Sequence, residues 1–167
     1  KWNVSNVRNF NSMFDFRNVN PKLRSVRVEP LYNKYNNDLS TWNISKDATT
    51  ESMFYEDFPL KYLPKNILIR KKVSEWFENR KKAENKYGRI GDWDVSDVTD
   101  MNKLFQDRIF NEDISKWNVS KVTDMAFMFE DLKYFNQPLN SWNVSNVTSM
   151  IYMFLGANSF NQPLNSW

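Results

Sequence analysis

The chain has no cysteine and no histidine among its 167 residues, and only 3 glycines. Without cysteine, it has no disulfide, no thiolate metal site and no thiol nucleophile. Without histidine, it lacks the imidazole base of the common catalytic triads and the usual ligand of zinc sites. It also lacks any run of about 18 apolar residues, so this sequence contains no candidate transmembrane helix. We therefore expect no enzyme activity, no catalytic residues and no cofactor.

Apolar residues make up 41% of the chain and aromatic residues 16%, which is enough for a substantial core. The net charge is only +3, but it is unevenly distributed. Basic residues are in excess between residues 59 and 90, whereas acidic residues are in excess from 91 to 167. The basic segment is a distinct part of the chain.

Tryptophan recurs with a period of about 25 residues over the last part of the chain. Five tryptophans open a similar phrase, such as WNVSKVTDMAFMF and WNVSNVTSMIYMF, with a phenylalanine 12 residues after the tryptophan. A second phrase, such as FNEDISKW or FNQPLNSW, places an aromatic residue seven positions before four of the tryptophans. The six repeated tryptophans are Trp2, Trp42, Trp93, Trp117, Trp142 and Trp167. A regular period of this length predicts stacked repeats that bury their apolar faces against one another.

The spacing of apolar residues changes within each repeat. From Trp142 to Val144 the alternation predicts a short strand with the tryptophan and valine facing inward and Asn143 facing outward. From Thr148 to Phe154 a spacing of about three predicts a short helix, with Thr148 as its N-cap. The predicted fold class is α/β, a tandem-repeat solenoid whose coils of about 25 residues each combine a short parallel strand with a short helix.

The order of residues from Leu139 to Asn161 resembles the repeat of BspA-like leucine-rich-repeat surface proteins, the DUF285 or mycoplasma-lipoprotein type. This resemblance implies a leucine-rich-repeat-like solenoid with parallel strands on one face, found in bacterial surface proteins and also in algae and large DNA viruses of protists. It implies an adhesive or interaction role and supplies no catalytic residues. The segment from Tyr87 to Ser96 resembles algal and protist-virus members.

Two segments interrupt the repeats. Residues 17–33 form an irregular insertion, and residues 66–85 predict one longer amphipathic helix with Ile69, Val73 and Trp76 on its apolar face. We therefore expect repeat coils over 1–64, a basic amphipathic cap helix and linker over 65–90, and a regular array over 91–167. Because both ends fall within a repeat, we expect a fragment of a longer protein.

Two groups of residues are candidate binding sites. The first is an exposed column at the position after each tryptophan: Asn3, Asn43, Asp94, Asn118 and Asn143. It is either a face that binds a protein or glycan, or a ladder that satisfies backbone groups in the turns. The second is a basic patch: Arg70, Lys71, Lys72, Arg80, Lys81, Lys82 and Lys86. It is either a contact for an anion or nucleic acid, or the solvated side of a cap helix, which the sequence favours.

Acidic residues offer two weaker hypotheses. Asp92, Asp94, Asp97 and Asp100 lie close together, but their spacing lacks the glycine and the terminal glutamate of a calcium loop, so we predict no metal site. A carboxylate pair such as Glu112 and Asp113 could in principle catalyse glycoside hydrolysis, but adjacent loop residues point apart and acidic pairs are common on surfaces.

The first functional hypothesis is a non-catalytic surface interaction or adhesion module at the cell surface, with a protein or glycan partner. The alternative is a structural subunit, of the minor capsid or scaffold type, in a virion or large assembly, with neighbouring subunits as its partners. A third reading is contact with an anion or nucleic acid through the basic patch, which the sequence disfavours.

Overall fold

The computed structural model describes Trp42 and residues 60–167. The chain divides into two compact units, Lys1–Pro64 and Lys65–Trp167. In the first unit, the described element is the 3₁₀ helix η3 (Leu60–Tyr62). The insertion predicted at residues 17–33 and most of the early repeats lie outside the described residues.

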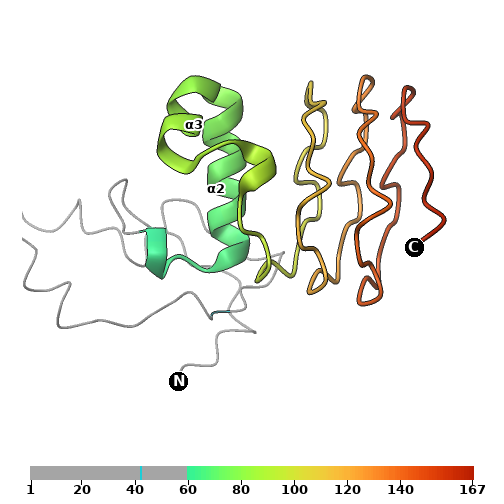
Figure 1. Ribbon diagram of the computed structural model, residues 1–167, viewed down its shortest axis with the longest axis horizontal. Coiled ribbons are helices and arrows are strands. Elements are labelled where there is room, and N and C mark those ends of the chain that lie inside the picture. Colours follow the sequence, from blue (N-terminus) through green and yellow to red (C-terminus); the bar gives the residue numbers. More distant parts are fainter. Residues whose placement is uncertain (1–41, 43–59) are drawn as a thin grey trace, which may run out of the picture. The chain divides into compact units, whose positions relative to one another are not determined.

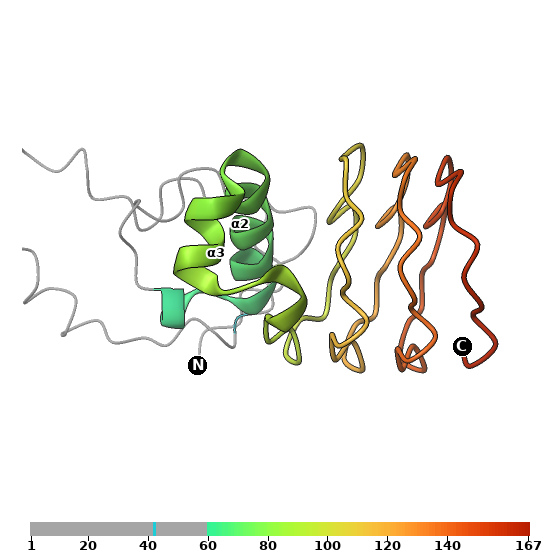
Figure 2. The same ribbon diagram turned by 45° about the horizontal axis from the view of Figure 1, so that its top comes forward.

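The second unit starts with two helices and continues as a series of coils (Figures 1 and 2). Helix α2 (Lys65–Glu78) and helix α3 (Arg80–Tyr87) lie side by side, and the 3₁₀ helix η4 (Ile90–Asp92) follows them. The chain then forms coil A (93–116), coil B (117–141) and coil C (142–166), each beginning at a tryptophan. In both views these coils lie next to one another in sequence order.

The single helix predicted over residues 66–85 is wrong in one respect, because it is broken at Asn79. Asn79 has an extended backbone, and its side-chain Oδ1 accepts a hydrogen bond from the Lys82 N–H at 2.9 Å. Asparagine competes in this way for backbone groups at the start of a helix, so α3 begins here as a new helix. The predicted apolar face is confirmed, because Ile69, Val73 and Trp76 are buried.

Backbone hydrogen bonds join each coil to the next. Met101 N–H donates to Asp124 O at 2.9 Å, and Lys103 N–H donates to Ala126 O at 3.0 Å. Coils B and C repeat the pattern, with Phe127 N–H donating to Ile151 O at 2.9 Å. These bonds satisfy groups that would otherwise be buried without partners, and they fix the register between coils.

The interior of each coil differs from the expected strand and helix. The parallel pairing lies later than Trp142–Val144, at isolated bridges that join Asp124 to Asp100 and to Ser149. Residues 151–156 form turns and no α-helix. Tyr152 has a φ of 53°, and one left-handed residue inside a right-handed helix interrupts it.

Aromatic rings fill the core between coils. Phe105, Phe129 and Phe154 stack in sequence, with centroids 6.0 and 5.4 Å apart. A second stack runs through Phe110, Phe135 and Phe160, at 6.0 and 5.9 Å. Stacked rings bury large apolar areas, and each coil supplies only one layer of each stack. The aromatic period of the sequence therefore produces continuous columns of rings.

Side chains form two further ladders between coils. The indole Nε1 of Trp142 donates to Ile114 O at 3.2 Å, and that of Trp167 donates to Leu139 O at 3.0 Å. The side-chain oxygen of Asn136 accepts a hydrogen bond from Asn161 N–H at 2.9 Å. These repeated polar residues satisfy the backbone of neighbouring coils.

Candidate interaction surface

The predicted column is exposed in all three described coils. Asp94, Asn118 and Asn143 occupy the same place in coils A, B and C, between the buried tryptophan and the following valine. Asn3 and Asn43 lie outside the described residues. The predicted inward tryptophan is confirmed in all three coils, and the predicted outward polar residue is exposed as an aspartate in coil A and as an asparagine in coils B and C. The column is therefore available to solvent.

In each column residue, one side-chain oxygen accepts a hydrogen bond from a serine two positions later in the same turn. Asn118 Oδ1 accepts from Ser120 N–H at 3.2 Å, and Asn143 Oδ1 accepts from Ser145 N–H at 3.1 Å. Within the described part of the chain, the side-chain NH₂ groups of Asn118 and Asn143 donate no hydrogen bond. The side-chain oxygens of Asn118 and Asn143 thus satisfy their turns, while their NH₂ groups have no partner among the described residues.

The column is charged at its first described position. Asp94 Oδ1 accepts hydrogen bonds from the Ser96 hydroxyl at 2.7 Å and from the Ser96 N–H at 3.0 Å. These bonds lower the pKa of the Asp94 carboxyl, and the charges of Lys65 and Lys72 lower it further. A carboxylate in coil A is therefore followed by neutral amides in coils B and C.

A second column was not predicted. Lys103, Phe127 and Tyr152 occupy equivalent places in the three coils and have left-handed φ values of 58°, 60° and 53°. Lys103 Nζ lies 5.1 Å from the centroid of the Phe127 ring, which lies 5.6 Å from that of Tyr152. The three residue types differ, so only their spacing of about 25 residues could have revealed this column. Non-glycine residues in this conformation are uncommon and costly.

The basic patch is largely neutralised within the unit. Arg80 binds Glu84 at 2.8 Å and Glu112 at 2.7 Å, and Arg70 binds Asp100 at 3.0 Å. Hydrogen bonds to the two glutamates raise the pKa of Arg80. These ion pairs reduce the positive charge that an anion would meet at the helix surface.

Glu75 neutralises two more basic residues of the patch. Its carboxylate binds Lys71 and Lys86, each at 3.0 Å, and accepts a hydrogen bond from the Tyr87 hydroxyl at 2.8 Å. Burial raises the pKa of Glu75, but the bonds from Tyr87, Lys86 and Lys71 outweigh burial and lower it to about 2. Glu75 is therefore ionised throughout the physiological range.

The three remaining basic residues divide into two kinds. Lys72 is half-buried and lies 5.3 Å from both the Tyr87 and the Trp93 ring centroids. Burial lowers its pKa, while the charge of Asp94 opposes that shift. Lys81 and Lys82 are exposed and form no ion pair among the described residues. Lys81 and Lys82 are therefore the two residues of the patch whose charges have no partner among the described residues. The other five are ion-paired or pack against aromatic rings.

The candidate acidic pair lines a cleft of about 170 Å³, but its two members have separate partners. Arg80 donates to both oxygens of Glu112, at 2.7 and 2.9 Å. Asp113 Oδ1 accepts from Ser115 N–H at 2.9 Å, and hydrogen bonds from Ser115 lower the pKa of Asp113. These contacts leave the pair without the shared arrangement that carboxylate catalysis needs.

The acidic cluster is likewise dispersed. Asp92 binds Arg89 at 2.8 Å, Asp97 binds Lys121 at 2.6 Å and Asp100 binds Arg70 at 3.0 Å. Over residues 60–167 and Trp42, no group of acidic side chains is arranged to hold a metal ion.

A family model described as "Mycoplasma protein of unknown function, DUF285" matches residues 1–66 and 71–167. The chain belongs to the DUF285 family. The short break in the match falls within α2, the element that departs from the repeat pattern. No curated protein and no solved structure matches this DUF285 chain. None of the helices in the described residues is long and apolar enough to cross a membrane.

Proposed function

We propose that this DUF285 chain is a non-catalytic interaction scaffold, a leucine-rich-repeat-like solenoid whose exposed column binds a protein or glycan at the cell surface. The observation that carries the proposal is the free NH₂ groups of Asn118 and Asn143 on adjacent coils. Their Oδ1 atoms are held by the turns, so the amides are oriented before any partner arrives. Preorganised donors lose little conformational freedom on binding.

The contrast with the other repeated polar residues supports this proposal. The Asn136 side chain joins coil B to coil C, and the indoles of Trp117 and Trp142 donate to carbonyls 27 and 28 residues earlier in the chain. Their repetition is explained by stacking alone. The column residues make only local turn contacts, so stacking does not account for the NH₂ group at the repeated asparagines.

The test is binding of the Asn118→Ala/Asn143→Ala variant to glycan and host-protein arrays and to intact cells. The matched control is Asn158→Ala/Asn165→Ala, which removes two exposed amides whose side chains make no hydrogen bond in the described residues. We expect the column variant to lose at least about tenfold in affinity, or about 1.4 kcal/mol, and the control to bind as the wild type does. Equal binding by all three proteins would exclude the column.

A structural role in a virion or large assembly is the competing proposal. It rests on the sequence resemblance to protist-virus members around Tyr87–Ser96. Quantitative mass spectrometry of purified particles and of protease-shaved intact cells separates the two roles. Peptides released from whole cells support the surface module, whereas stoichiometric, protease-resistant peptides in particles support the subunit.

A further inference from the structure

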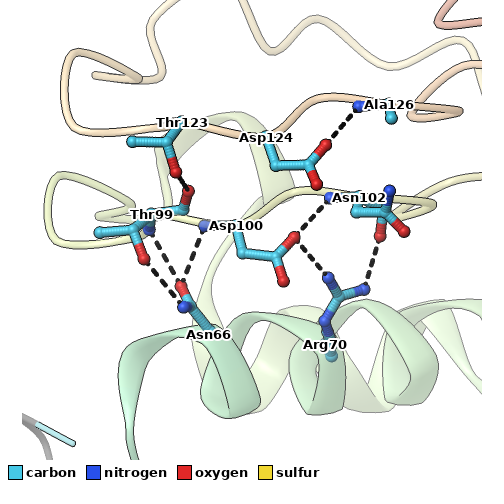
Figure 3. Close-up of polar contacts among 8 residues, drawn as sticks. All are labelled: Asn66, Arg70, Thr99, Asp100, Asn102, Thr123, Asp124 and Ala126. Atoms are coloured by element: carbon cyan, nitrogen blue, oxygen red, sulfur yellow. Dashed lines mark hydrogen bonds and ion pairs between the residues drawn. The ribbon is translucent and has the colours of Figure 1, made fainter. Parts of the chain in front are cut away.

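Most polar groups that recur from coil to coil are used in contacts within the chain. Thr123 Oγ1 donates to Thr99 O at 3.1 Å (Figure 3), and Thr148 Oγ1 donates to Thr123 O at 3.0 Å. Asn146 Nδ2 donates to Ser120 O at 2.7 Å. These side chains join neighbouring coils and are therefore not available to a partner.

The edge of coil A that faces α2 is occupied as well (Figure 3). Thr99 N–H donates to Asn66 Oδ1 at 2.9 Å, and Arg70 Nη1 donates to Asn102 O at 2.8 Å. Arg70 Nη2 also donates to Asp100 Oδ1 at 3.0 Å. Because α2 satisfies these backbone groups, a partner has to contact the coils along their exposed side.

The column asparagines and the serines two positions later provide free polar groups on that side. The NH₂ groups of Asn118 and Asn143 and the hydroxyls of Ser120 and Ser145 donate no hydrogen bond in the part of the chain that the structure describes. Asn118 is exposed although coils A and C lie on either side of it, so this exposure is a property of the stacked array. Coils B and C thus each present one amide donor and one hydroxyl, which donates or accepts.

The repeat distance of the coils sets the interval between these groups. The rings of Trp142 and Trp167, at the position directly before the column, are parallel with centroids 6.4 Å apart. The two phenylalanine stacks repeat at 5.4 to 6.0 Å. An extended polypeptide points the N–H and C=O of every second residue to the same side, at intervals of about 6.4–6.8 Å. The amide donors therefore recur at nearly the interval of these carbonyls.

We propose that the partner of the column is an extended polypeptide segment that lies across the coils and is recognised through its backbone. This inference rests on the proposed function and names the partner of the same column. Carbonyls of alternate residues accept from the NH₂ groups of Asn118 and Asn143. The N–H groups of the same residues donate to the hydroxyls of Ser120 and Ser145.

Charge favours a basic segment over a polyanion. Acidic residues are in excess between 91 and 167. Asp94, at the start of the described column, is ionised because hydrogen bonds from Ser96 lower its pKa, although Lys65 and Lys72 offset part of its charge. A nucleic acid would be repelled by this array, whereas lysine or arginine side chains of a peptide would be attracted.

The experiment is a nuclear magnetic resonance titration of the full 167-residue chain with a peptide of alternating threonine and lysine that is long enough to cross coils A to C. Threonine favours the extended form, and lysine supplies the positive charge. We expect the side-chain NH₂ signals of Asn118 and Asn143 to shift and those of Asn158 and Asn165 to stay in place. The same peptide with every backbone nitrogen methylated should bind at least about tenfold more weakly. Equal binding by the methylated peptide would overturn the proposal.

Asn118→Asp/Asn143→Asp tests the donors while keeping the turns, because Asp94 forms the same turn in coil A. This variant replaces each NH₂ group with an acceptor, so its affinity for the peptide should fall at least about tenfold despite the added negative charge. Asn158→Asp/Asn165→Asp adds the same charge elsewhere and should bind at least as tightly as the wild type. Unchanged affinity in the column variant, or an equal loss in both variants, would contradict recognition by the column amides.

A further comparison separates this inference from the proposed function. If the wild type ignores the peptide but binds a folded protein or a glycan, and Asn118→Ala/Asn143→Ala loses that binding, the column is an interaction surface and the extended-peptide partner is wrong. If the alanine variant binds every array partner as the wild type does, the proposed function fails too. Peptide binding that depends on the column amides and on the peptide N–H groups supports both.

Discussion

At the scale of single residues, the repeated tryptophans combine two tasks. The rings of Trp117 and Trp142 are buried in the core, and their indole N–H groups donate to carbonyls 27 and 28 residues earlier, Ile90 O and Ile114 O. A phenylalanine would fill part of the same space but would remove this hydrogen bond, so the carbonyl would keep only its backbone donor, the N–H of Trp93 or of Trp117. This explains why tryptophan opens each coil although phenylalanine is the commoner aromatic residue of the chain.

Trp117→Phe should lower the free energy of unfolding by about 0.5–1.5 kcal/mol, because the Ile90 carbonyl loses one of its two donors and keeps only the Trp93 N–H. Trp76→Phe is the matched control, since the Trp76 indole nitrogen is buried without a partner in the described residues. Urea denaturation followed by far-ultraviolet circular dichroism measures both. An equal or larger loss for Trp76→Phe would contradict this role of the indole N–H.

Glu75 makes the free energy of unfolding depend on pH in the acidic range. Its pKa is lowered from the ordinary 4.5 to about 2 in the folded chain, so its contribution is present above about pH 4.5 and is lost as the pH falls towards 2. Glu75→Gln should therefore be less stable than wild type by roughly 1–2 kcal/mol at pH 7, allowing for partial exposure, and about equal to it near pH 2. Unfolding free energies across this range, with Glu78→Gln as control, provide the measurement. A pH-independent difference would show that Glu75 acts by packing alone.

At the scale of elements, the turns of each coil depend on left-handed residues at two fixed positions. One position holds Lys103, Phe127 and Tyr152, and the other holds Asp107, Asp131 and Gly156. The position of Asp107, Asp131 and Gly156 is occupied by glycine only once, so residue type alone does not predict its left-handed conformation. The sequence predicted a helix here from the spacing of apolar residues, and that spacing fits a chain of turns equally well.

Gly156 should tolerate substitution less well than Gly88, although both have positive φ values of 71° and 77°. A Cβ on Gly156 would lie 2.2 Å from Asp131 Oδ1, whereas a Cβ on Gly88 would meet nothing within 4 Å. Both alanine variants lose about 1 kcal/mol from the backbone, and Gly156→Ala should lose more. Thermal unfolding of the two variants tests this, and an equal loss would mean that Asp131 moves aside freely.

The predicted cap helix, which is α2 and α3 in the structure, was only partly predicted from the sequence. Its buried face followed from the spacing of Ile69, Val73 and Trp76, because one apolar stripe is enough to predict one docked face. Its break at Asn79 was missed, since asparagine is tolerated on the polar side of a continuous helix. The roles of Asn66 and Arg70 were also missed, because they depend on which backbone groups of coil A are free.

At the scale of the whole molecule, the period of the sequence predicted which residues face inward and which form the exposed column. Those predictions hold in coils A and B, where Trp117 and Val119 are buried around an exposed Asn118. The position of the parallel pairing was missed, because the bridges involve Asp100, Asp124 and Ser149, whose side chains have no apolar signature. The extension of this architecture to the early repeats remains a prediction from their sequence.

The central claim is that some repeated amides hold the coils together while the column amides are free for a partner. Nuclear magnetic resonance of side-chain NH₂ exchange with water tests it directly. Gln137 and Gln162 donate to the preceding coil at Asn111 O and Asn136 O, so their NH₂ groups should exchange slowly, whereas those of Asn118 and Asn143 should exchange as rapidly as free asparagine. Slow exchange at Asn118 and Asn143, matching that of the glutamines, would contradict the account.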